Sequence, residues 1–94
     1  MPKGVSDMNM KEFYERRIKD DAKSLEFFNR QIEWHNKHLK RCREVDKRIS
    51  EKNGEKFKSC ATRDHEKWRS YYYRQRKKYK AQIAEYQRKL ASEN

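Results

Sequence analysis

The segment best suited to chemistry combines cations with aromatic rings. Residues 67–80 hold seven Lys or Arg, five aromatics and no acid. Cations neutralise phosphates and release counterions, and aromatic faces offer stacking surfaces to exposed bases. The segment therefore predicts a nucleic-acid contact whose cations are Lys67, Arg69, Arg74, Arg76, Lys77, Lys78 and Lys80.

A second acid-free run, residues 37–43, adds Lys40, Arg41 and Arg43 to this predicted contact. In an antiparallel hairpin it would lie beside residues 61–67. Two other interpretations stay open. Cations on the outer face of a coiled coil often serve only solubility, and the same surface would suit an acidic protein. No recognisable module for reading a base sequence is present.

A third set of reactive residues consists of His38, Cys42, Cys60 and His65. Two Cys and two His could hold a tetrahedral zinc ion near the turn of a hairpin. The spacing matches no familiar zinc finger, and a Cys42–Cys60 disulfide or two free thiols are alternatives. We expect free thiols and no bound metal.

Catalysis has little support in the sequence. There is no Gly-rich phosphate loop, no nucleophile elbow and no metal-binding HExxH motif. We therefore expect a protein that is not an enzyme and uses no cofactor.

The composition indicates long helices. Charged residues make up 44% of the 94-residue chain and apolar residues 33%, while Gly and Pro total three, so one domain without a thick core is expected. The net charge of +11 favours polyanionic partners. We expect no membrane span and a reducing compartment, with the cytoplasm as the default and the nucleus or an organelle also compatible.

The start of the first helix has three local signals. Asn9 is a good N-cap, and Glu12 lies at the spacing of a capping box. Met8 and Phe13 have the spacing of a hydrophobic staple. A tail over residues 1–8 and a helix beginning at residue 10 are therefore predicted.

The apolar pattern predicts an all-α fold, an antiparallel two-helix coiled-coil hairpin over residues 9–94. Its helices span 10–49 and 57–91, around a turn at 50–56 that contains Asn53-Gly54. The first seam comprises Tyr14, Ile18, Leu25, Phe28, Ile32, His35, Leu39, Cys42, Val45 and Ile49. The second comprises Phe57, Ala61, His65, Trp68, Tyr72, Tyr79, Ile83, Tyr86 and Leu90.

The turn also sets an expected register between the two seams. It would pair Tyr14 with Leu90, Ile18 with Tyr86, Leu25 with Tyr79, Ile32 with Tyr72 and Leu39 with His65. Asp21 interrupts the first seam. It would either determine register and partner choice from a buried position or be bypassed through Ala22.

Aromatic residues outside the seams indicate a further contact, because one seam buries little surface. We expect two copies to pair into a four-helix bundle; a different protein or a sparsely packed monomer are the alternatives. The predicted interface residues are Phe27, Trp34, Tyr71 and Tyr73.

The sequence thus predicts a small basic binding protein that docks on nucleic acid or a nucleoprotein assembly. The alternatives are an adaptor or inhibitor that binds a host protein through its aromatic stripe, and a structural subunit of a larger complex.

Overall fold

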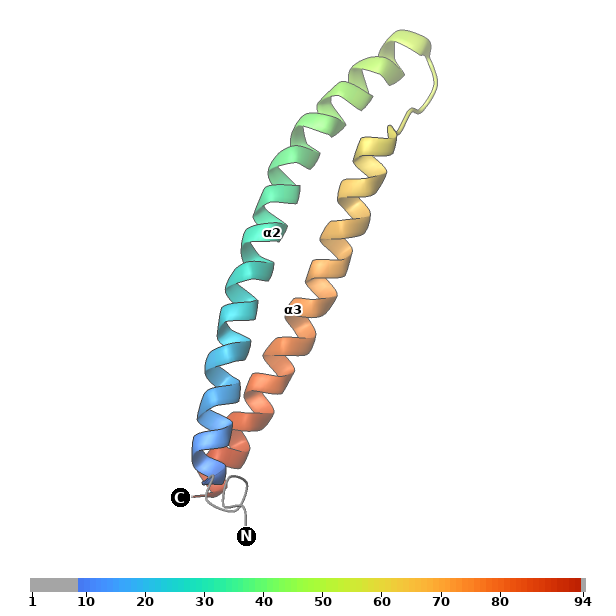
Figure 1. The fold of residues 1–94 in the computed structure, drawn as a ribbon. Coiled ribbons are helices and arrows are strands. Elements are labelled where there is room, and N and C mark those ends of the chain that lie inside the picture. Colours follow the sequence, from blue (N-terminus) through green and yellow to red (C-terminus); the bar gives the residue numbers. More distant parts are fainter. Residues whose placement is uncertain (1–8, 94) are drawn as a thin grey trace. The chain divides into compact units, whose positions relative to one another are not determined.

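The computed structural model describes residues 9–93, and those residues form two helices and no strand. Helix α2 spans Met10–Asn53 and helix α3 spans Cys60–Ser92. They are joined by residues 54–59 into an antiparallel helical hairpin (Figure 1). The predicted all-α hairpin is confirmed, while pairing of two copies stays a prediction.

The N-terminus of α2 has the predicted cap. The Asn9 side-chain oxygen accepts a hydrogen bond from the Lys11 N–H at 2.8 Å, which satisfies one of the free amides of the first turn. Met8 and the predicted tail over residues 1–8 lie outside the described residues.

The turn lies further along the chain than predicted. Helix α2 continues past Ile49 to Asn53 because Gly54, with a φ of 75°, is the residue that can leave the helix in a left-handed conformation. Its N–H donates to the Ser50 carbonyl at 2.8 Å. Phe57, predicted to open the second helix, belongs to the turn, and its N–H donates to the Ser50 hydroxyl at 2.8 Å.

Helix α3 begins at Cys60 because Ser59 caps it. The Ser59 hydroxyl accepts a hydrogen bond from the Thr62 N–H at 3.2 Å, as an N-cap serine does. The predicted turn over 50–56 is therefore replaced by 54–59. Phe57 stays 44% exposed and is not a seam residue.

A buried polar contact attaches the start of α3 to α2. The Thr62 hydroxyl donates to Asp46 at 2.6 Å, and the Ser59 N–H donates to the same carboxylate oxygen at 3.2 Å. Both Thr62 and Asp46 are buried. The hydrogen bond from Thr62 is the main reason that the pKa of Asp46 lies below its ordinary value.

The chain forms two compact units, each containing a segment of both helices side by side (Figure 1). Among the described residues, unit 1 comprises 9–27 and 76–93, and unit 2 comprises 28–75. All cross-helix contacts given below lie within one unit.

In unit 1, α2 and α3 meet through rings and a cation. The centroids of the Tyr14 and Tyr86 rings are 6.0 Å apart, and the Arg17 guanidinium lies 5.8 Å from the Tyr86 centroid. The expected register paired Tyr86 with Ile18, so this contact departs from the expected pairing by one helical turn. Asp21 is buried and Ala22 exposed, so the seam passes through the acid.

In unit 2 the predicted seam is confirmed at Ile32, His35 and Leu39, which are all buried. It is wrong at Val45, Ala61 and Trp68, which are all exposed. At each position the next residue along the chain, which is polar, faces the other helix instead. Asp46 and Thr62 are buried in place of Val45 and Ala61, and Arg69, beside Trp68, is half-buried and bonded across the helices.

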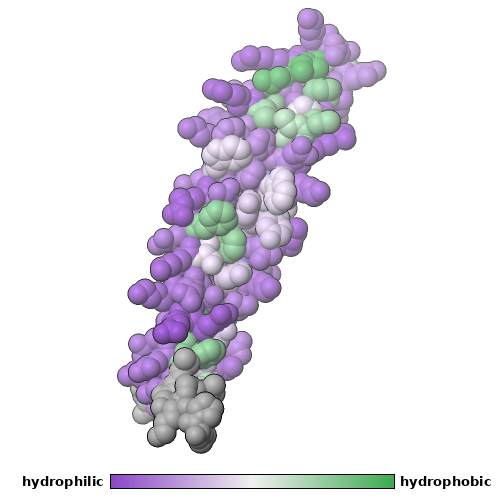
Figure 2. Space-filling model, in the orientation of Figure 1, coloured by the Kyte–Doolittle hydropathy of each residue, from purple (hydrophilic) through white to green (hydrophobic). Residues whose placement is uncertain are grey.

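The visible surface is mostly hydrophilic, with separate hydrophobic areas rather than one continuous apolar face (Figure 2). This agrees with a chain whose charged residues outnumber its apolar ones. Packing between the helices must therefore rest on a few aliphatic layers, ring contacts and buried hydrogen bonds.

Replacing Thr62 with Val is expected to lower the melting temperature by roughly 5 °C. The substitution keeps the shape of the side chain but leaves the buried Asp46 carboxylate without its hydroxyl donor. Circular dichroism at the helix band measures the midpoint.

Ser70→Ala is the matched control, because it removes a hydroxyl from an exposed position on α3 and should leave the midpoint unchanged. Equal midpoints for all three proteins would contradict an anchoring role for Thr62.

Candidate nucleic-acid interface

The ten cations of the predicted interface divide between the two units. Unit 1 contains Arg76, Lys77, Lys78 and Lys80. Unit 2 contains Lys40, Arg41 and Arg43 on α2 and Lys67, Arg69 and Arg74 on α3.

Two of these six cations, Arg43 and Arg69, bind other side chains of the same chain. Arg43 forms an ion pair with Glu66 at 2.9 Å, and Lys58 binds the other oxygen of Glu66 at 2.7 Å. Lys58 and then Arg43 lower the pKa of that carboxyl. Arg69 donates to the Asn36 side chain at 2.9 Å. The sequence interpretation missed Glu66 because it lies one residue before the acid-free segment.

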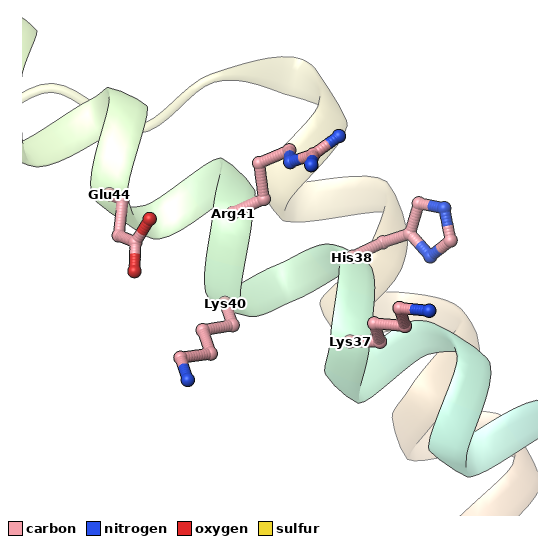
Figure 3. A pocket seen from close by; sticks show the side chains of 5 residues that line it. All are labelled: Lys37, His38, Lys40, Arg41 and Glu44. Carbon is pink, nitrogen blue, oxygen red and sulfur yellow. The ribbon is translucent and has the colours of Figure 1, made fainter.

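The outer face of α2 carries an open pocket lined by Lys37, His38, Lys40, Arg41 and Glu44. Figure 3 shows that all five side chains come from one helix, with His38, Lys37 and Arg41 extending to one side and Lys40 and Glu44 to the other. Three cations and an imidazole against one acid form a surface suited to an anion. Lys37 and His38 were not among the predicted contacts, although both belong to the acid-free run over residues 37–43.

Three histidines gather next to this pocket. The Nδ1 atoms of His35 and His65 are 2.8 Å apart, and the rings of His38 and His65 stack with centroids 5.5 Å apart. In an imidazole pair joined through Nδ1, one nitrogen donates and the other accepts, so both cannot carry a hydrogen. Burial, followed by the nearby His65 and His38, lowers the pKa of His35.

The tautomer of His38 follows from its partner. Its Nδ1 lies 2.8 Å from the Trp34 backbone carbonyl, and a carbonyl only accepts, so Nδ1 is the donor. In the neutral ring the lone pair is therefore on Nε2.

The zinc site and the disulfide that the sequence allowed are not formed in the described part of the chain. Cys42 and Cys60 are both free thiols. Within residues 9–93, no three His, Cys, Asp or Glu side chains are grouped as ligands for a metal ion. His65 instead bonds to His35, and His38 to a backbone carbonyl.

Neither α2 nor α3 has an apolar stretch that could cross a bilayer.

The four aromatics of the predicted interface are exposed in the described chain. Phe27 lies in unit 1, and Trp34, Tyr71 and Tyr73 lie in unit 2. Phe27 and Tyr73 also make contacts within the chain. Their role at an interface stays a prediction.

Comparison with known proteins identifies no relative: no family model, no curated protein and no solved structure matches this chain. A function must therefore be argued from the site itself.

Lowering the pH from about 7.5 to about 5.5 is expected to reduce the free energy of unfolding. The pKa of His35 is lower in the folded protein than its ordinary value, so the folded state binds fewer protons than the unfolded chain across this window. The contribution of neutral His35 to the free energy of unfolding is therefore fully present above pH 6.5, the ordinary pKa of histidine, and is lost as the pH falls. Urea denaturation at each pH measures the effect.

His35→Leu serves as the control because it places an apolar residue in the seam and removes the buried titrating group. Its stability should depend less on pH than that of the unaltered protein. An equal pH dependence in both proteins would show that His35 does not cause it. Asp46 and Glu66, whose pKa values are lowered, do not titrate in this range.

Proposed function

We propose that this protein is a non-enzymatic nucleic-acid-binding protein that holds phosphate groups in the pocket of unit 2. The observation that carries the proposal is the placement of Lys37, Lys40 and Arg41 around one open pocket on α2. Lys and Arg side chains bind phosphate through charge-assisted hydrogen bonds, and each phosphate contact releases counterions.

The pocket cations are available to a ligand. The ion pairs Arg43–Glu66, Lys58–Glu66 and Lys89–Glu85 do not include Lys37, Lys40 or Arg41. Glu44 is the single acid of the pocket. An incoming phosphate would therefore meet cations that need not first leave an internal partner.

The overall charge supports the same class of partner. A net charge of +11 on 94 residues attracts polyanions at long range and accelerates their association. Within unit 2, the exposed cations Lys67 and Arg74 of α3 would add phosphate contacts to those of the pocket.

An adaptor that binds an acidic protein is the second candidate. The exposure of Trp34 (50%) and Tyr71 (40%) favours it, because large exposed aromatics are frequent in protein interfaces.

Replacing Lys37, Lys40 and Arg41 together with Gln is expected to weaken binding of a nucleic acid tenfold or more, roughly. Loss of three phosphate contacts should also reduce the slope of log K against log salt by about 2 to 3. Fluorescence anisotropy of a labelled oligonucleotide between about 50 and about 200 mM salt measures both quantities.

The charge-matched control replaces Lys11, Lys19 and Lys23 with Gln. All three are exposed on the segment of α2 that belongs to unit 1. Equal weakening by both triple variants would mean that only net charge matters. Binding that does not respond to salt would contradict the proposed function.

A further inference from the structure

The two sides of the helix–helix contact in unit 2 have different chemistry. Arg69 bonds to Asn36 on one side. Trp34 lies two residues before Asn36, and Tyr71 two residues after Arg69, so each is turned roughly 200° around its helix from that bond. We call the opposite side, formed by Trp34, His38, Trp68 and Tyr71, the aromatic flank.

The Trp34 indole is held in place although it is half exposed. Its ring centroid lies 4.9 Å from that of His35, 4.1 Å from that of His38 and 5.4 Å from that of His65. Three neighbours from two helices leave the ring little freedom to turn. A rigid ring with an open surface binds a flat ligand without first paying much conformational entropy.

The second aromatic position is built in the same way. The Trp68 ring lies 5.8 Å from that of Tyr71 and 6.2 Å from that of Tyr72. Trp68 and Tyr71 are 49% and 40% exposed. Tyr72 in turn stacks on His35 at 5.8 Å, so a continuous series of ring contacts joins Trp34 to Trp68.

Cations lie one helical turn from each exposed ring. On α2, Arg30 is four residues before Trp34 and Lys37 is three residues after it. On α3, Lys67 is four residues before Tyr71 and Arg74 is three residues after it. Residues at these spacings are neighbours on a helix surface, and all four cations are exposed. The aromatic flank is therefore bordered by positive charge on both helices.

We propose that the aromatic flank binds single-stranded nucleic acid, with bases stacked on Trp34 and Trp68 and phosphates on the neighbouring cations. This inference rests on the proposed function and identifies the class of nucleic acid. In a duplex the base faces are already covered by their neighbours, so a stacking ring gains nothing there, whereas a single strand exposes them.

Charge decides between the possible occupants of this surface. A second copy of the chain would bring another +11 to a surface that is already bordered by Arg30, Lys37, Lys67 and Arg74. A single strand is anionic and aromatic, and so complements both the cations and the rings.

The test compares two labelled probes with the full chain, a 20-nucleotide oligothymidylate and a mixed 20-base-pair duplex. The unaltered protein should bind the single strand more tightly. Trp34→Ala should weaken single-strand binding about tenfold and change duplex binding less than about twofold. Trp34→Phe, which keeps a ring, should retain most of the affinity, and circular dichroism verifies that each variant is folded.

The outcomes separate this inference from the proposed function. If Trp34→Ala leaves single-strand binding unchanged while the triple Gln variant still weakens both probes, the stacking inference fails and phosphate binding stands. If neither probe binds in a salt-dependent manner, both fail. A poly-glutamate probe that competes as well as the oligonucleotide and also requires Trp34 would overturn the inference in favour of an acidic protein. A dimer that dissociates on Trp34→Ala would overturn it in favour of self-association.

Discussion

The buried hydrogen bond between Thr62 and Asp46 is the contact on which the arrangement of unit 2 depends. A turn of six residues leaves many ways to set one helix against the other. This bond selects one of them, because a buried carboxylate without its donor is costly. Once Thr62 is placed at the level of Asp46, four residues along α3 and three residues back along α2 bring Glu66 beside Arg43. The ion pair on this flank of unit 2 follows from that placement.

Sequence reasoning predicted the hairpin because the hydrophobic spacing repeats over both helices, and the cap at Asn9 followed from a local rule. It placed the turn too early because the polar composition of residues 50–56 was taken to mark the whole turn. The decisive features were the positive φ of Gly54 and the capping hydroxyl of Ser59. Polar residues in the core were the second difficulty. From the sequence alone, Asp46 and Thr62 are expected on the surface because both are polar. They are buried because they hydrogen-bond to each other, and such a partner, distant in sequence, is not visible in the local pattern.

The sequence predicted which segments of the candidate site are positively charged, but not the contacts that each cation makes. Runs of Lys and Arg identified the charged segments, yet two of the six cations in unit 2 proved to bind Glu66 and Asn36. The flank carrying these bonds pairs Arg43 with Glu66 and Arg69 with Asn36. The other flank leaves rings and cations exposed, and it is the side where a partner gains most. No composition-based argument distinguishes these two sides, because they alternate along the same few residues of each helix.

The short Nδ1–Nδ1 contact between His35 and His65 has a consequence for the tautomers of the two rings. In the neutral pair one Nδ1 donates and the other accepts, so one ring has its hydrogen on Nδ1 and the other has it on Nε2. The bond that joins α2 to α3 at this level therefore requires opposite tautomers of the two imidazoles, and one Nε2 atom of the pair is left with a lone pair.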